Sequence, residues 1–434
     1  MPMTLPELLC PAGDMDRLDA ALTYGANACY LGGTSLSLRA GTGGFDCEAL
    51  ATACRKAHAR GASIYYTINV LPHETHLSGI AASLEALAES DVDGLIIADP
   101  GVLRMARRYA PDKAVHLSTQ ANTANSEAVG FWYDLGIRRV NLARELGARA
   151  MRELVRNYPD MEFEVFVHGA MCLALSGRCL LSAWLNRRPA NLGECTHPCR
   201  FEYRATDLSG RCHDCAAEGH THMSEALLGV EEKTRDTGTM WEVTREEPYS
   251  AFWAPEDLCL VKYMPWFVRT GIASLKIEGR MKTPSYVAHV TDAYRTALDD
   301  VAAGCFRPEK YLYELRNTAS RNLSTGFFLP DGNRISLPPL QEAERRPIVA
   351  QVRERLAEDA WKVAVRSPWR SDRPIQIMQT GLRRPELPAG AYTLENHRGE
   401  ASTQLHPGME GVLRCDPAAL PSGPETLEQG LFLR

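Results

Sequence analysis

The sequence lacks the features of a membrane or secreted protein. It has no run of about 18 apolar residues, the length that a membrane-spanning helix needs. Its first residues, MPMTLPELLCPAGDMD, have neither a basic start nor a long apolar stretch, so they do not resemble a secretory signal. We therefore expect a cytoplasmic protein without a membrane contact. In a reducing compartment, its 13 cysteines are expected to be thiols or metal ligands rather than disulfides.

Two motifs of hydrolytic enzymes are also absent. The sequence contains neither the HExxH helix of zinc proteases nor the GxSxG turn of serine hydrolases. A cysteine peptidase needs a thiolate paired with a histidine, and His168 precedes Cys172 closely enough to be considered. The net charge of -6 over 434 residues argues against a surface wholly adapted to nucleic acid, although it leaves room for a local basic face.

Short β-type runs alternate with helical segments over most of the chain. The eight expected strands are Glu7–Cys10, Ala28–Leu31, Ser63–Val70, Gly94–Ala98, Ala114–Ser118, Arg139–Leu142, Glu162–Val167 and Ser274–Ile277. Alternation of this kind indicates a parallel sheet with helical crossovers. Eight such units predict a (β/α)8 TIM-type barrel, with an open doubly wound sheet as the alternative.

Two segments depart from this alternation. Residues 205–250 are polar, rich in turn residues and aperiodic, which predicts an insertion between the seventh and eighth strands of a barrel domain spanning 1–335. From residue 345 to 434 the pattern becomes strand-like, as in PIVAQVRERL, WKVAVRS and PIQIMQT, with Pro and Gly between the runs. This change predicts a small all-β barrel domain at the C-terminal end.

Four cysteines follow the seventh expected strand, at Cys172, Cys179, Cys195 and Cys199, with six, fifteen and three residues between them. Four thiolates are the usual ligand set of an iron–sulfur cluster or of an all-cysteine zinc site. The long, uneven intervals differ from the short paired knuckles of zinc ribbons, which favours iron–sulfur. The alternative is a set of inert buried thiols.

A second group of metal-ligand types lies in the insertion. Cys212 and Cys215 form a CxxC motif, followed by His220 and His222. This set could bind zinc, although a solvated loop is the simpler interpretation.

Charged and polar residues gather where the expected strands end. Lys276, Glu278 and Arg280 end the eighth strand, and strand alternation directs all three to one face. At the barrel mouth these buried charges would bind an anionic metabolite, or they would form a structural ion network. We take these three and His168 as candidate catalytic residues. Candidate substrate-binding residues are Arg39, Asn69, Gln120, Asn122, Asn125 and Arg144.

Arginines recur near these positions. One series precedes the cysteines (Arg138, Arg139, Arg144, Arg149, Arg152 and Arg156), and another surrounds them (Arg178, Arg187, Arg188, Arg200, Arg204 and Arg211), interleaved with Trp184, Phe201 and Tyr203. Arginine with aromatic residues suits phosphate contact and base stacking, which predicts RNA binding. The alternative is a solvated charged face.

Several blocks resemble the collagenase-like peptidases of family U32. The first comprises Glu164-x-Phe166, His168-Gly169-Ala170-Met171-Cys172, Ser176-Gly177-Arg178-Cys179 and Ser182. The others are ELLCPAGDMDRLDAALTYGANACYLGG, VHLSTQANTAN, DLCLVKYMP and SLKIEGRMKTPSYVAHVTDAYRTALDD. Together they cover about residues 5–330.

The resemblance implies an activity on RNA. It is strongest to family members that take part in forming 5-hydroxyuridine at the tRNA wobble position with prephenate as a required metabolite. It implies a cluster, 4Fe-4S in the first instance, on Cys172, Cys179, Cys195 and Cys199, with Cys259 as a candidate replacement for Cys199. It further implies tRNA and prephenate as partners and allows a partner protein of the same family. The alternatives are proteolysis and an iron–sulfur subunit that binds RNA without catalysis of its own.

Overall fold

The computed structural model describes residues 4–33, 44–172, 175, 179–186, 188, 190–192, 194–200, 203–207, 228–232, 241–243, 256–330, 335–420, 423 and 425–434. None of the helices in this part of the chain has the length and apolar character required to cross a membrane.

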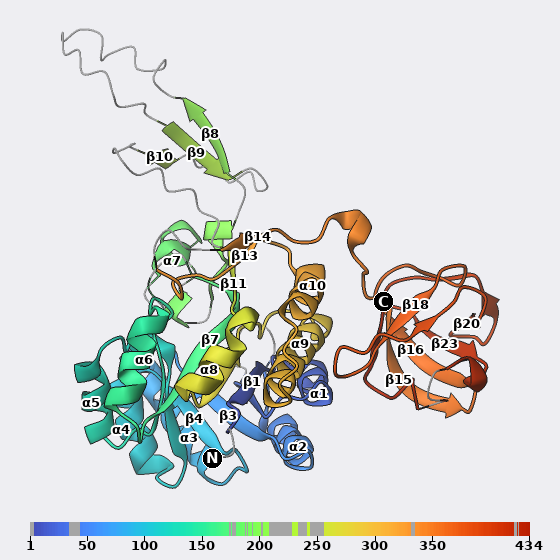
Figure 1. The fold of residues 1–434 in the computed structure, drawn as a ribbon. Helices are drawn as coiled ribbons and strands as arrows, with labels where there is room; N and C mark the ends of the chain where they lie inside the picture. Colours follow the sequence, from blue (N-terminus) through green and yellow to red (C-terminus); the bar gives the residue numbers. More distant parts are fainter. Residues whose placement is uncertain are drawn as a thin grey trace, which may run out of the picture.

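Eight parallel strands form a closed barrel (Figure 1). They are β1 (Glu7–Pro11), β2 (Ala28–Leu31), β3 (Ser63–Ile68), β4 (Gly94–Ile97), β5 (Ala114–Leu117), β6 (Arg139–Asn141), β7 (Glu162–Ala170) and β12 (Ser274–Ile277). Each pairs with its neighbour, and β12 pairs with both β1 and β7, which closes the ring. The TIM-type barrel and all eight expected strands are confirmed, and the open sheet is excluded.

Helices follow or precede the strands around the barrel. They are α1 (Met15–Thr23), α2 (Cys47–His58), α3 (Leu77–Ala88), α4 (Pro100–Tyr109), α5 (Ser126–Asp134), α6 (Ala148–Asn157), α8 (Met264–Thr270), α9 (Pro284–Ala302) and α10 (Pro308–Thr318). Several begin at a side-chain cap: Asp14, Asp46, Asp99 and Thr283 each accept a hydrogen bond from a backbone N–H in the first turn. Such caps stabilise a helix start and fix where each loop at the barrel mouth ends.

The sheet continues beyond the barrel at the end of β7. Here β11 (Asp257–Cys259) runs antiparallel to the last residues of β7, and β13 (Leu323–Ser324) and β14 (Ser336–Leu337) extend the sheet further. None of these short strands was expected from the sequence. Within the insertion, β8 (Tyr203–Asp207), β9 (Leu228–Glu232) and β10 (Trp241–Val243) form an antiparallel sheet where no strand was expected.

The C-terminal segment folds into an antiparallel sheet, as predicted. Its strand order is β19 (Glu386–Leu387), β18 (Ile375–Met378), β25 (Phe432–Leu433), β15 (Ala350–Ala357), β16 (Ala360–Val365), β23 (Glu410–Cys415), β20 (Tyr392–Asn396) and β21 (Ala401–Ser402). β17 (Trp369–Arg370) and β22 (Gln404–Leu405) pair separately. Trp361 and Trp369 are buried in its core.

The C-terminal sheet is attached to the barrel by buried polar contacts. Arg384 lies 2.8 Å from Asp292 on α9 and 3.3 Å from Glu314 on α10. Arg434 also pairs with Glu314, at 2.8 Å, and the Tyr24 hydroxyl donates to the carbonyl of Met378. Because each buried charge here has an opposite partner, the two parts are held in one relative position.

Candidate functional site

A cavity of about 390 Å³ opens at the C-terminal ends of the barrel strands, and we name it the mouth cavity. Active sites of TIM-type barrels lie at this end. Ten of the residues singled out from the sequence line it: Asn69, Gln120, Arg144, Cys172, Cys179, Cys195, Cys199, Lys276, Glu278 and Arg280. The fold therefore brings the cysteines and the candidate charged residues into one cavity, although they are far apart in sequence.

Lys276 belongs to a buried ion pair. Its Nζ lies 2.7 Å from Oε1 of Glu164 on β7, and both side chains are almost completely buried. Asn141 donates to the same carboxylate oxygen at 2.8 Å. The ammonium also lies over the ring of Tyr30, 4.5 Å from its centroid. These partners keep the Lys276 charge in one place beneath the cavity.

Sequence reasoning gave Glu164 no role of its own. An acidic residue in the middle of the apolar run EFEVFV was the available signal, because a buried carboxylate requires a partner. Oε2 of Glu164 and Oδ1 of Asn141 are buried and have no hydrogen-bond partner among the described residues. Two buried acceptors without a described partner therefore lie beside Lys276.

Glu278 and Arg144 face each other across the cavity. Their charged groups are 3.7 Å apart, and both side chains are largely buried. The Arg144 guanidinium lies over the Phe166 ring at 4.0 Å and reaches to 3.9 Å from the sulfur of Cys172. Arg144 thus connects the strand-end charges with the cysteine segment.

Arg280 is buried, and its Nη1 donates to the hydroxyl of Thr67 at 3.1 Å. The strand β12 ends at Ile277, so Glu278 and Arg280 stand on the loop that follows it. This loop passes directly against Gly13 and Gly169, where a Cβ atom would meet the carbonyls of Arg280 and Glu278, respectively. The two glycines thereby position the charged loop over the cavity.

Gly169→Ala is expected to displace this loop. A Cβ at residue 169 would lie 2.6 Å from the Glu278 carbonyl, and φ there is +105°, which L side chains rarely adopt. We expect the activity of the site to fall by at least about tenfold, since a displacement of about 1 Å at a site can cost about two orders of magnitude. The matched control is Gly304→Ala, at φ +69° with no atom within 4 Å. Equal activities of the two variants would contradict this positioning role.

The cysteine segment is held by a local network. The Ser182 hydroxyl on α7 (Leu181–Asn186) accepts from the backbone N–H of Thr196 at 3.1 Å, and Asn186 donates to the Thr196 hydroxyl. The backbone N–H of His197 donates to the sulfur of Cys195 at 3.4 Å. Burial raises the pKa of the Cys179 thiol, with Cys195 and Cys172 close enough to add to the shift.

The sulfurs of the four cysteines are not arranged in this structure as the ligands of a single metal ion. Among the described residues, no three His, Cys, Asp or Glu side chains lie close enough together to hold one metal ion. A zinc ion draws four ligands onto one centre, whereas the thiolates of a 4Fe-4S cluster bind different iron atoms and stay farther apart. Four cysteines around one cavity, with backbone N–H groups directed at sulfur, fit the second arrangement better.

His168 and Cys259 lie away from the mouth cavity. His168 is buried in contact with the Tyr294 hydroxyl, 3.3 Å from Nδ1, and burial lowers its pKa to about 3. Cys259 pairs with it across β11 and β7 and lines a different, small cavity. Cys199, in contrast, lines the mouth cavity with the other three cysteines. Cys259 is therefore badly placed to replace Cys199 as a ligand. His168 does not pair with Cys172, although a cysteine peptidase would require such a pair.

Two other candidates have local structural tasks. Asn125 caps α5, because its side chain accepts a hydrogen bond from the backbone N–H of Ala128. Asn122 adopts a left-handed backbone conformation at φ 53°, and its side-chain amide donates a hydrogen bond to the Gln120 carbonyl. Neither lines the mouth cavity. Arg39 and the group Cys212, Cys215, His220 and His222 lie outside the described residues.

Residues 13–337 match the model of Peptidase family U32. The chain belongs to this family. It is 37% identical over 340 residues to tRNA hydroxylation protein P of Escherichia coli (strain K12), with 75% of each chain covered. It is 39% identical over 329 residues to tRNA hydroxylation protein P1 of Bacillus subtilis (strain 168), covering 74% of this chain and 71% of the relative. A 23S rRNA 5-hydroxycytidine synthase of E. coli is 31% identical over 297 residues, but only 39% of that protein is covered. The matched range of the U32 protein contains every described residue of its mouth cavity.

Proposed function

We propose that this U32 protein hydroxylates tRNA at the mouth cavity, on C5 of the wobble uridine. Two relatives that each cover about three quarters of the chain are named tRNA hydroxylation proteins. The observation that carries the proposal is that four cysteines and the cations Arg144, Lys276 and Arg280 line a single cavity. A redox-active centre beside an anion-binding pocket is what an oxidative RNA modification needs.

An iron–sulfur cluster would be held by Cys172, Cys179, Cys195 and Cys199. When bound, such a cluster supplies one-electron transfer at a potential set by its hydrogen bonds and burial. In this chain the N–H of His197 on Cys195 and the nearby Arg144 guanidinium would stabilise negative charge on the sulfurs. Ser182 and Asn186 hold the second cysteine pair at the cavity through Thr196.

Prephenate would enter the cavity as an anionic co-substrate. Arg280 is the residue best suited to bind one carboxylate, because a guanidinium can bind both oxygens at once. Lys276 would contribute the second positive charge from the cavity floor while Glu164 keeps it in position. Glu278 is the only carboxylate among the described lining residues, so it is the candidate to hold or accept a proton at the bound base.

A deletion strain of the source organism, complemented with variants of this chain, tests the activity. We expect mass spectrometry of bulk tRNA to show loss of 5-hydroxyuridine derivatives on deletion and full recovery with the wild-type chain. Unchanged levels in a strain without a related gene would refute the proposal. Recovery with Lys276, Glu278 and Arg280 all neutralised would instead indicate a binding subunit that serves a catalytic partner.

A further inference from the structure

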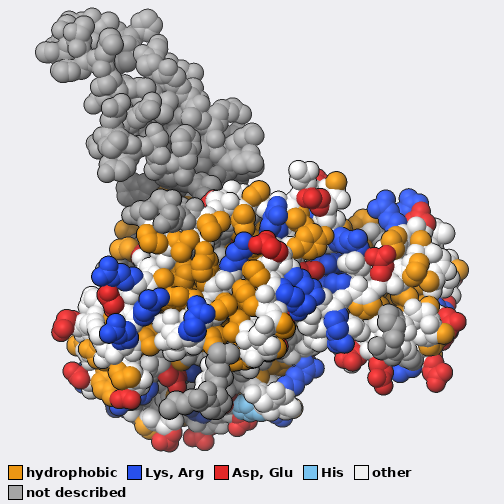
Figure 2. Space-filling model, viewed as in Figure 1, with side chains coloured by type: hydrophobic (Ala, Val, Ile, Leu, Met, Phe, Trp, Pro, Cys, Tyr) orange, Lys and Arg blue, Asp and Glu red, His pale blue; other side chains and the backbone are white. Residues whose placement is uncertain are grey.

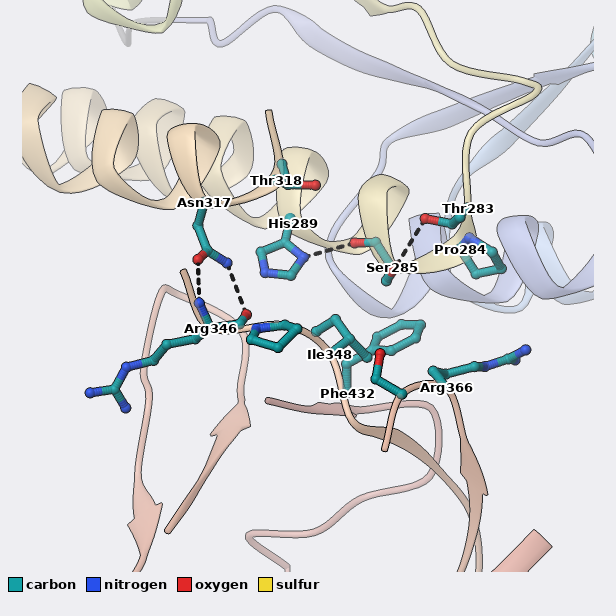
Figure 3. Close-up of a pocket in the computed structure, with 12 residues that line it drawn as sticks. Thr283, Pro284, Ser285, His289, Asn317, Thr318, Arg346, Ile348, Arg366 and Phe432 are labelled. Carbon is teal, nitrogen blue, oxygen red and sulfur yellow. Dashed lines mark hydrogen bonds between the residues drawn. The ribbon is translucent and has the colours of Figure 1, made fainter. Parts of the chain in front are cut away.

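A second cavity lies between the barrel and the C-terminal sheet, and it shares no lining residue with the mouth cavity (Figure 3). Its volume of about 430 Å³ falls within the roughly 300–1,000 Å³ typical of small-molecule sites. We name it the interdomain cavity. One wall comes from α9 and α10 and carries Ser285, His289 and Asn317, and the opposite wall carries Ile348 and Phe432.

The lining has a distinct chemical character. It combines apolar groups (Pro284, Pro347, Ile348 and Phe432) with hydroxyl and amide groups (Thr283, Ser285, Asn317, Thr318 and Ser367), and no carboxylate is among the described residues that line it. Burial lowers the pKa of His289 to about 4, so its ring is neutral at physiological pH. Apolar faces with a few hydrogen-bonding groups suit a planar heteroaromatic ring such as a nucleobase.

Two arginines flank this cavity. Arg346 and Arg366 both line it and extend away from each other on opposite sides (Figure 3). Their side chains remain 47% and 39% exposed although each reaches a carboxylate, Glu386 at 3.2 Å and Asp16 at 3.6 Å. Exposed ion pairs of this kind are weak, so both guanidiniums can turn to phosphate at little cost.

The interdomain cavity adjoins the mouth cavity along the chain. Gly279, Arg280, Met281 and Lys282 line the mouth cavity, and the next residues, Thr283–Ser285, line the interdomain cavity. Figure 2 shows Lys and Arg side chains gathered along the line where the C-terminal sheet meets the barrel. A polyanion bound at the mouth would therefore continue over a basic surface to the second cavity.

We propose that the interdomain cavity binds a nucleotide of the substrate RNA, distant from the nucleotide that is modified. The base of this nucleotide lies between the cavity wall that carries Pro284 and the wall that carries Phe432. The phosphates on either side of the base contact Arg346 and Arg366. This proposal rests on the proposed tRNA substrate and adds a second point of attachment. It explains why the C-terminal sheet is fixed rigidly on α9 and α10, since the cavity exists only when both walls are in place.

Binding of an unmodified tRNA transcript to the anaerobically purified full chain tests the proposal. The dissociation constant is measured between 50 and 200 mM salt for wild type and for Arg346→Gln/Arg366→Gln. We expect about tenfold weaker binding and a salt slope lower by about two, one for each lost phosphate contact. The matched control is Arg370→Gln/Arg414→Gln, which removes two exposed, ion-paired arginines elsewhere in the C-terminal segment and should leave binding unchanged.

A steric variant separates base binding from charge. Ser367→Trp fills the cavity without removing a cation, so it should weaken tRNA binding with an unchanged salt slope, while its melting temperature stays near that of wild type. Wild-type affinity and slope in both variants would overturn the proposal. So would uridine monophosphate binding that Ser367→Trp abolishes while tRNA affinity is unaffected, because the cavity would then serve a free nucleotide. Failure of wild type itself to bind tRNA would instead refute the proposed function.

Discussion

Cys172→Ser is expected to abolish tRNA hydroxylation and to prevent binding of the proposed iron–sulfur cluster while the protein remains folded. Cys172 is exposed at the mouth cavity, so the substitution neither opens a core cavity nor leaves a buried group unpaired. A hydroxyl is a poor ligand for iron in a cluster, and the loss of one of four thiolates destabilises the whole group. Iron and sulfide content should fall together with 5-hydroxyuridine in tRNA, by more than about tenfold.

The control for this substitution is Cys47→Ser. Cys47 is also exposed, but it lies at the start of α2 and does not line the mouth cavity. It should retain full iron content and activity. A Cys172→Ser protein that keeps wild-type iron, sulfide and hydroxylation would contradict the assignment of this residue as a ligand.

The second large effect is expected for Lys276→Met. The substitution leaves the Glu164 carboxylate buried without its cation, which costs about 3–5 kcal/mol of stability. Adding Glu164→Gln should restore most of this stability, because the amide needs no counter-charge and can keep its contact with Asn141. Hydroxylation should stay absent in the double variant, since the positive charge at the cavity floor is still missing. Chemical denaturation and the tRNA assay together separate the two consequences.

Lys262→Met serves as the control for the lysine substitution. Lys262 pairs with Glu309 at 2.8 Å, but both side chains are exposed. Its loss should cost less than about 1 kcal/mol and leave activity unchanged. Full hydroxylation by the Lys276→Met/Glu164→Gln protein would show that the Lys276–Glu164 pair has a purely structural role.

The barrel was predictable because its strands are short, buried and regularly separated. SIYYTI and GLII are short runs rich in apolar, aromatic or β-branched residues, each followed by a turn and a helical pattern. This alternation can be recognised from the sequence alone, without knowledge of tertiary contacts. The strands β11, β13 and β14 were not predictable in the same way. They have two or three residues each. They form because β7 extends to Ala170, so that its last residues can pair with β11.

Site residues were predictable where their position at a strand end brings them to the cavity. They were not predictable where a local hydrogen bond decides which way the side chain points. Lys276 reaches the cavity because it lies on β12, and Arg280 reaches it from the loop that follows this strand. Asn125 follows β5 equally well in sequence, but its side chain caps α5 instead. His168 was selected for its nearness to Cys172, yet the strand continues through it and turns its ring toward Tyr294 on α9. Nothing in a single sequence distinguishes these cases, because hydrogen bonds to the backbone compete with binding for the same side chains.

We propose that four thiolates at the mouth cavity hold iron and inorganic sulfide. Anaerobic purification followed by iron, sulfide and zinc analysis of the same sample tests it most directly. We predict about four iron and four sulfide per chain and no stoichiometric zinc. One zinc per chain without sulfide, or neither metal in a fully active protein, would contradict the claim.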